Sequence, residues 1–377
     1  MGREGVFISM ISIINDGSRF STALLCTLIL SIFSMLFLHL PLISIASASN
    51  ADHSPLLASI RHSGGHYLAV LTWNSVSAKY EVARIVSPEG HNAGTPAVHE
   101  GVMAFTMEEE GKYDIHIASV DQALDCQFRN VTSHLEGHFS DPGFIDSRQI
   151  ALSGNVRGRN SLFLLDLDTM ECRDLTPDFV NAGQPSALPG LPFIVFTGIA
   201  SGSPVYNGNT DIYSLDLKDG KIRRITEGNT LICEGHPFLY SACSAKTGED
   251  RGVSPTSSVS PIQIVPRILI SAAGGTYSGE SFMVTDSNIA SIDPFKGELH
   301  SVTSGSIFKG APSFFNEETI YLAMDRAGER NLHVWKDGRS IPLTDGLFIA
   351  SFCFCPDIRL TGTSAVVAPS SGGSNGH

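Results

Sequence analysis

The feature that most constrains this chain is a short hairpin pattern that recurs along it. Its clearest copy, residues 211–228 (DIYSLDLKDGKIRRITEG), places apolar residues on alternate positions before it reaches Asp219 and Gly220. Alternation with a period of two is typical of a half-buried strand, and an Asp-Gly pair favours the tight turn of a hairpin. Because an isolated two-stranded hairpin is only marginally stable in water, this one must pack against further strands.

Similar hairpins end on a threonine or serine at a nearly regular spacing. The closing residues are Ser87, Thr132, Thr176, Thr226, Thr303 and Thr344, with intervals of 45, 44, 50, 77 and 41 residues. Two further apolar runs precede the hairpins, and the first run opens near a proline at Pro96, Pro142, Pro185 and Pro312. Such a period indicates an array of supersecondary units, and four strands in each unit are typical of a propeller blade.

Six hairpin endings predict an all-β fold, a six-bladed β-propeller of four-stranded antiparallel blades over residues 49–362. The expected blades are residues 54–90, 91–134, 135–178, 179–228, 229–305 and 306–346. Residues 347–362 are expected to complete the first blade, because closure of the ring removes exposed sheet edges.

The fifth interval is longer than the others. It contains residues 245–261, which are rich in Ser, Thr, Gly and Pro and predict a loop inserted into the fifth blade. A seventh, degenerate blade in this interval is the alternative. Residues 363–377 form a tail rich in Gly and Ser that is expected to be disordered.

Residues 1–48 have the features of a secretory signal. Arg19 precedes an apolar run over residues 22–45, and Ala46, Ser47 and Ala48 form a small-residue cleavage site. We therefore expect a signal peptide and a periplasmic or secreted mature protein. An uncleaved signal anchor is the alternative, since about 20 apolar residues are enough to cross a bilayer.

Charge and cysteine content limit the partners and the covalent links. The formal net charge of −13 argues against binding to nucleic acid or to an anionic membrane, so membrane contact is expected only through an uncleaved N-terminal segment. Six cysteines follow residue 48, an even number that permits disulfides without fixing their pairing.

The repeats resemble those of the TolB-like, WD-like propeller family over about residues 54–362. The best matches are residues 211–213 with Ile225 and Thr226, and Cys355-Pro356-Asp357, which stands where the family has Ser-Pro-Asp. The resemblance implies a propeller scaffold for protein binding. The same repeats are similar to the propellers of prolyl oligopeptidase-like enzymes. The only G-x-S-x-G match, residues 372–376, lies in the Gly- and Ser-rich tail and not between a strand and a helix, so it does not fit a nucleophile elbow, which argues against serine-peptidase chemistry.

Three histidines are candidate metal ligands. His91, His138 and His236 lie in segments expected to connect the last strand of one blade to the first strand of the next. In a propeller these connections converge near one face of the channel, so the three rings could meet there. Oligogalacturonate lyases, which are similar propellers, use channel histidines with a metal. We favour the simpler interpretation that these are polar loop residues on a solvated face.

Aspartates recur in the hairpin turns, at Asp166, Asp168, Asp216, Asp219, Asp293 and Asp337. An aspartate in a turn hydrogen-bonds to nearby backbone groups, which explains this placement without catalysis.

These observations predict an exported, non-enzymatic propeller that acts as a scaffold for protein interaction or ligand binding. The expected partner is a protein or small ligand at the channel mouth or at residues 245–261, and no cofactor is expected. A metal-assisted polysaccharide lyase or hydrolase with a divalent metal at the channel histidines is the alternative, so enzymatic activity stays open. A regulatory propeller separated from a hydrolase partner is a third hypothesis.

Overall fold

The computed structural model describes residues 53–62, 64–120, 127–202, 210–226, 232–244, 263–278, 281–305, 308–324 and 328–354. They belong to a compact unit, His53–His377, and all of their named elements are β-strands. The expected signal over residues 1–48, the expected loop 245–261 and the expected tail 363–377 lie outside the described residues. No helix capable of spanning a membrane is found within the described ranges.

Four sheets have four antiparallel strands each. The first follows the order β24 (Ile349–Phe354), β1 (Leu56–His62), β2 (Gly65–Asn74) and β3 (Lys79–Ile85). The second contains β4 (Ala93–His99), β5 (Val102–Glu109), β6 (Lys112–Ser119) and β7 (Arg129–Asn130). The third contains β16 (Ile232–Ser244), β17 (Gln263–Ser278), β18 (Ser281–Ile292) and β19 (Leu299–Ser301). The fourth contains β20 (Phe308–Phe315), β21 (Glu318–Met324), β22 (Arg330–Lys336) and β23 (Arg339–Pro342).

The fifth sheet has eight strands, so the described residues form four separate four-stranded blades where six were expected. One half contains β8 (His138–Phe144), β9 (Gln149–Val156), β10 (Arg159–Asp166) and β11 (Cys172–Asp174), and the other β12 (Phe179–Ala187), β13 (Phe193–Ala200), β14 (Asp211–Asp216) and β15 (Ile222–Arg224). A single parallel bridge, Asn160 with Asn181, joins β10 to β12 and merges the two halves.

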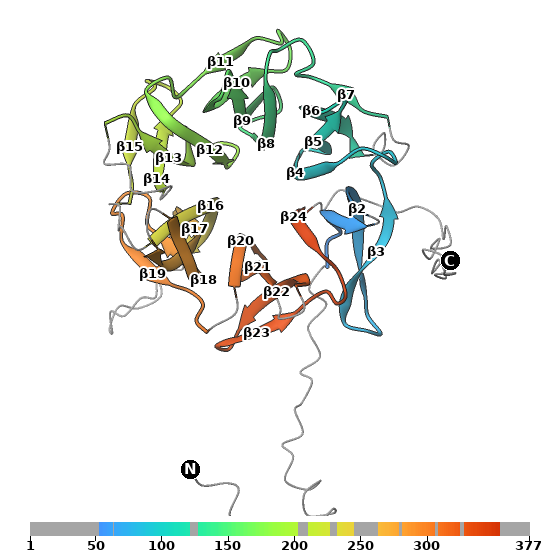
Figure 1. Ribbon diagram of the computed structural model, residues 1–377. Coiled ribbons are helices and arrows are strands. Elements are labelled where there is room, and N and C mark those ends of the chain that lie inside the picture. Colours follow the sequence, from blue (N-terminus) through green and yellow to red (C-terminus); the bar gives the residue numbers. More distant parts are fainter. Residues whose placement is uncertain are drawn as a thin grey trace, which may run out of the picture. The chain divides into compact units, whose positions relative to one another are not determined.

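The sheets stand around a common centre as an all-β propeller (Figure 1). Strand β24, from the C-terminal part of the chain, pairs antiparallel with β1, from Leu56 with Phe354 to Ile60 with Ile349. This pairing protects the inner edge of β1 and holds the last strand of the ring to the first.

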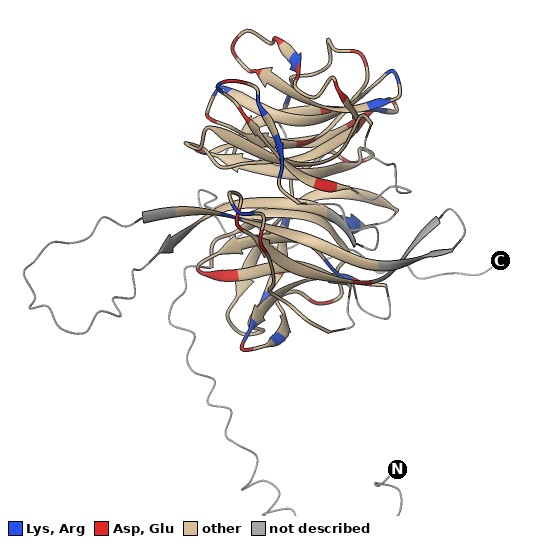
Figure 2. Ribbon diagram, turned by 90° about the vertical axis from the view of Figure 1, so that its left-hand side faces the viewer, with Lys and Arg blue, Asp and Glu red and all other residues tan. Residues whose placement is uncertain are grey.

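The hydrophobic core lies between neighbouring groups of strands. Leu68 of β2, for example, belongs to the same buried cluster as Phe105 of β5, and Leu239 of β16 shares a cluster with Val195 of β13. Charged residues are found mainly in turns and at the outside of the propeller, whereas much of the strand ribbon carries no charge (Figure 2). Apolar packing between their faces therefore contributes to holding adjacent blades together.

The closing threonine of each repeat has the same structural task. The backbone N–H groups of Leu68, Ile115, Leu162, Ile212, Ile289 and Leu332 donate to the hydroxyls of Ser87, Thr132, Thr176, Thr226, Thr303 and Thr344, at 2.9 or 3.0 Å. All six hydroxyl residues are buried. The regular spacing seen in the sequence thus marks a repeated clamp between the end of each hairpin and the third strand from the channel.

Candidate functional site: the central cavity

Five strands next to the channel, β4, β8, β12, β16 and β20, share a bulge at a residue that precedes proline. The bulged residues are Thr95, Asp141, Gln184, His236 and Ala311, whose positive φ angles are 43°, 50°, 52°, 48° and 45°. Positive φ is uncommon for residues other than glycine. The following proline has no N–H, so each bulge leaves one backbone donor, that of the bulged residue, to be satisfied.

The preceding blade supplies the acceptor in all five cases. Thr95 N–H donates to Ser351 Oγ at 2.9 Å, and Asp141 N–H donates to Thr95 Oγ1 at 3.3 Å. The N–H groups of Gln184, His236 and Ala311 donate to Ser153 Oγ, Gln184 Oε1 and Ser271 Oγ at 2.9, 2.8 and 3.2 Å. We call the five bulged residues the collar. Its backbone is fixed by contacts from blade to blade around the channel.

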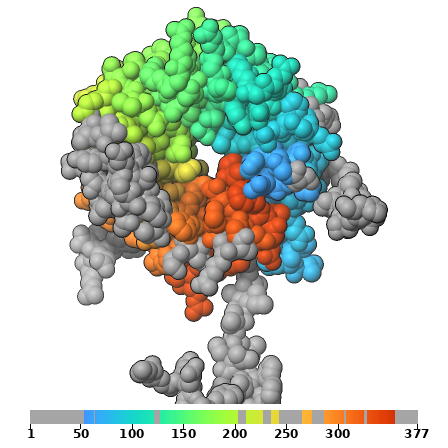
Figure 3. All heavy atoms as spheres, in the orientation of Figure 1, coloured from blue at the N-terminus to red at the C-terminus, as the bar shows by residue number. Residues whose placement is uncertain are grey.

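A cavity of about 690 Å³ lies at the centre and is lined by three collar residues, Asp141, Gln184 and His236. Figure 3 shows the hollow between the green and yellow residues on one side and the orange and red residues on the other. Its volume is within the range of pockets that hold small molecules.

A second set of lining residues comes from one repeated position, two residues before the third-strand residue whose N–H donates to the closing threonine. Tyr113, Asn160, Thr210, Ser287 and Arg330 all occupy it and all line the cavity. In four of the repeats the next residue is an Asp or Asn: Asp114, Asp211, Asn288 and Asn331. The sequence pattern did not indicate this set, because four of the expected hairpins begin one residue later, at the Asp or Asn, and only the one that begins at Asn160 includes the position. Alignment of the repeats on their closing threonines would have identified it.

Arg330 is the charged member of that set. Neither a hydrogen bond nor an ion pair to its guanidinium occurs within the described ranges, although its backbone N–H donates to Leu347 O at 3.2 Å. Burial lowers the pKa of Arg330 from its usual value. An arginine nevertheless stays protonated in a protein at neutral pH, so the cavity wall carries a cation that a ligand can reach.

Two charges of opposite sign act on His236. Its pKa is lowered mainly by the surrounding protein and then by the charge of Arg330, while Asp141 acts in the opposite direction. The ring is therefore neutral at pH 7, although His236 is exposed at the cavity. Its Nε2 lies 3.3 Å from Gln184 Nε2, which makes it an acceptor for the Gln184 amide.

The three candidate histidines do not meet. His138 and His236 line the cavity, but they lie in the inner strands β8 and β16 and not in the connections where the sequence placed them. His91 is elsewhere, with Nδ1 2.9 Å from Glu108 O. Within the described part of the chain, no group of three or more His, Cys, Asp or Glu side chains is close enough to hold a metal.

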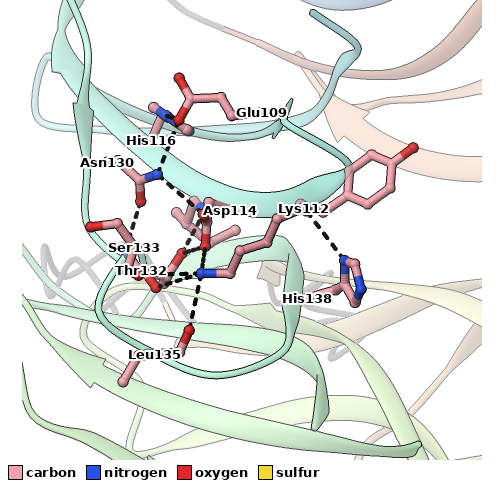
Figure 4. Close-up of polar contacts among 11 residues, drawn as sticks. Glu109, Lys112, Asp114, His116, Asn130, Thr132, Ser133, Leu135 and His138 are labelled. Carbon is pink, nitrogen blue, oxygen red and sulfur yellow. Dashed lines mark hydrogen bonds and ion pairs between the residues drawn. The ribbon is translucent and has the colours of Figure 1, made fainter.

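Tyr113, which lines the cavity, is flanked in the second blade by a polar network. Figure 4 shows the network around Lys112 and Asp114. Lys112 Nζ lies 3.0 Å from Asp114 Oδ1, which also accepts a 2.7 Å hydrogen bond from Thr132 Oγ1. Asn130 donates to Asp114 Oδ2 at 3.2 Å, and Tyr113 N–H donates to His138 Nδ1 at 3.3 Å. The carboxylate and the amine satisfy each other, so this network holds the strand in place.

The turn aspartates act on the backbone. Asp166 Oδ1 accepts from the N–H groups of Asp168 and Thr169 at 3.0 and 2.9 Å. Asp216 Oδ1 and Asp293 Oδ1 make the same pair of contacts in their own turns. Their carboxylates are used by the turns themselves, as the sequence predicted.

No protein-family model matches the sequence, and no curated protein sequence matches it. Among solved structures, TolB from Acinetobacter baumannii is similar, with a TM-score of 0.51 and 16% identity over 77% of this chain and 63% of that one. A putative TolB from Agrobacterium tumefaciens has a TM-score of 0.50 and 15% identity over 78% of this chain and 88% of that one. The chain therefore spans less than two thirds of the first of these proteins.

The protein is a β-propeller, and its fold is that of the TolB-like propellers. An oligogalacturonate lyase in complex with manganese also matches, with 13% identity and a TM-score of 0.42 over 77% of this chain and 73% of that one, a similarity too low to support an inference.

Proposed function

We propose that this protein is an exported, non-enzymatic propeller that binds a ligand in its central cavity. The observation that supports this most directly is the cavity of about 690 Å³ with Arg330 in its wall. Among the described residues, the guanidinium of Arg330 has no hydrogen-bond or ion-pair partner. Polar groups that converge on one concave site are typical of binding pockets.

The construction of the cavity supports a binding role. The collar is held through backbone N–H groups, so the ring provides a rigid frame before any ligand arrives. A preorganised site loses less conformational entropy when it binds. The cavity-lining amides of Asn155, Asn160 and Asn181 offer both donors and acceptors to a ligand.

The proposal includes six blades. The two halves of the eight-stranded sheet share only one bridge, and each has its own antiparallel order, as in the other blades. A buried cluster that includes Leu162 of β10 and Phe196 of β13 packs the two halves against each other like neighbouring blades. Export is proposed on the sequence of residues 1–48 alone.

The proposed function is tested by a ligand screen with a cavity-blocking variant. Asn155→Trp places a large ring at the cavity wall, and Val76→Trp adds the same ring at a turn residue that is 94% exposed. Compounds or partner peptides that raise the melting temperature of the wild type should fail with Asn155→Trp and succeed with Val76→Trp. A ligand at 100 times its Kd contributes about 2.7 kcal/mol to stability, which such an assay detects. Equal binding by both variants would place the ligand outside the cavity.

A further inference from the structure

Arg330 extends from the third strand of its blade to the channel. Its Nη2 lies 4.0 Å from the position that a β-carbon on Gly310 of the inner strand β20 would take. The guanidinium therefore lies beside the backbone of the inner strand, at the cavity wall. Holding an arginine partly out of water without a counter-ion costs free energy, and a bound anion would recover it.

We propose that the cavity recognises a carboxylate group of its ligand through Arg330. This inference rests on the proposed function, since it names the chemistry of a ligand for the same cavity. The guanidinium presents two parallel N–H donors in a planar fork, a geometry that matches the two oxygens of a carboxylate.

The other charges of the cavity favour a monoanion. Asp141 lines the same cavity, and its charge and that of Arg330 act in opposite directions on the pKa of His236. A phosphate dianion would be repelled by Asp141, whereas a carboxylate carries a single charge and can lie against Arg330. Lys309 is buried, and its Nζ donates to Asn288 Oδ1 at 3.0 Å and Gly305 O at 3.4 Å, so its charge is already engaged within the fold.

The remaining wall indicates what the carboxylate is attached to. Phe308 and Met324 pair across β20 and β21 at the cavity and are 41% and 42% exposed. The carboxylate of Asp141 offers hydrogen-bond acceptors to a ligand. A ligand with hydrogen-bond donors near Asp141 and an apolar part against Phe308 fits these surfaces.

Two carboxylates from different sources, each with a neutral partner, test the proposal. The probes are a tripeptide with a free C-terminus and its C-terminal amide, and glucuronate and glucuronamide, with inorganic phosphate as a third anion. The variants are Arg330→Ala and Arg330→Lys, with Arg157→Ala as the matched control because the Arg157 side chain is 84% exposed. Calorimetry measures binding, and thermal unfolding checks that each variant is folded.

We expect one carboxylate to bind, and its amide to bind roughly 10- to 100-fold more weakly, the range for a hydrogen bond to a charged group. Arg330→Ala should lose a similar factor, Arg330→Lys should retain part of the affinity, and Arg157→Ala should match the wild type. The pair that binds identifies the source as a peptide terminus or a sugar acid. Phosphate should bind weakly to the wild type and more tightly to Asp141→Asn.

Two results would overturn the carboxylate inference alone. One is equal affinity for a carboxylate and its amide, and the other is a folded Arg330→Ala variant that binds as well as the wild type. If neither carboxylate binds while compounds from the screen bind in the cavity independently of Arg330, the inference is also wrong but the binding function stands. If nothing binds that Asn155→Trp can block, the proposed function itself is wrong.

Discussion

At the scale of single residues, the closing threonine contributes more than its size suggests. Thr344 is fully buried, accepts from Leu332 N–H at 2.9 Å and donates to Asn331 Oδ1 at 3.0 Å. Thr344→Val keeps the shape but leaves a buried N–H and an amide oxygen without this partner. We expect a loss of about 1–3 kcal/mol in the free energy of unfolding, measured by chemical denaturation. Thr344→Ser, which keeps the hydroxyl, should lose clearly less, and equal losses would contradict the role of the hydrogen bonds.

Asp114 should make stability depend on pH in the acidic range. Burial alone would raise the pKa of this carboxyl, but hydrogen bonds from Thr132, Lys112 and Asn130 and the charge of Lys112 together lower it. The folded pKa is therefore below the unfolded value of about 3.9, so the stabilisation is present above that pH and is lost as the pH falls through the folded pKa.

Asp114→Asn should accordingly destabilise the protein at pH 7, by about 1–3 kcal/mol for the loss of charged hydrogen bonds. The difference from the wild type should shrink below about pH 4, where the wild-type carboxyl also takes up a proton. Denaturation curves of both proteins between pH 3 and 7 measure it. A difference that does not change with pH would show that the charge of Asp114 is unimportant.

At the scale of strands, the sequence predicted the hairpins best. Their alternating apolar residues, Asp turns and closing threonines are local patterns, and local patterns are visible without the fold. The prolines Pro96, Pro142, Pro185 and Pro312 were recognised as opening the inner strands, but their effect on the preceding residue was not. Each follows a Gly or Ser and one variable residue, and the same tripeptide occurs at Gly235-His236-Pro237. This signal would have identified the collar.

Other features of the strands depend on contacts that no local pattern encodes. The bridge between Asn160 and Asn181 joins two separately patterned groups of strands, so the sequence predicts two blades where hydrogen bonding forms one sheet. Arg330 of β22 approaches Gly310 of the inner strand β20, although these two strands are not hydrogen-bonded to each other. Of the three candidate histidines, His138 and His236 line the cavity from inner strands, whereas His91 contacts Glu108 O, a difference that no local pattern in the sequence indicates.

At the scale of the whole molecule, stability should depend on closure of the ring. β24 pairs with β1. Ile349 of β24 is buried in a cluster with Leu56 of β1 and with Leu322 of β21 in the neighbouring blade. Deletion of residues 349–377 would expose this apolar surface and leave β1 with an open edge that can pair with other chains. We expect loss of the cooperative thermal transition and aggregation, seen by calorimetry and size-exclusion chromatography.

Deletion of residues 363–377 is the control for ring closure, because it retains β24. This shorter deletion should leave the melting temperature unchanged within about 2 °C, which corresponds to well under 1 kcal/mol for a domain of this size. If the longer deletion melts as the wild type does, the contact between β24 and β1 contributes little to the fold.

The collar has an evolutionary consequence. The ring is joined through the backbone N–H groups of Asp141, His236 and Ala311, and no neighbouring bulge depends on a side-chain acceptor from these three residues. Thr95 and Gln184 differ, because their side chains accept the bond from the next blade. Mutation can therefore change the chemistry of the channel at three positions while the architecture persists. A lineage of such rings could exchange one specificity for another without first having to rebuild its fold.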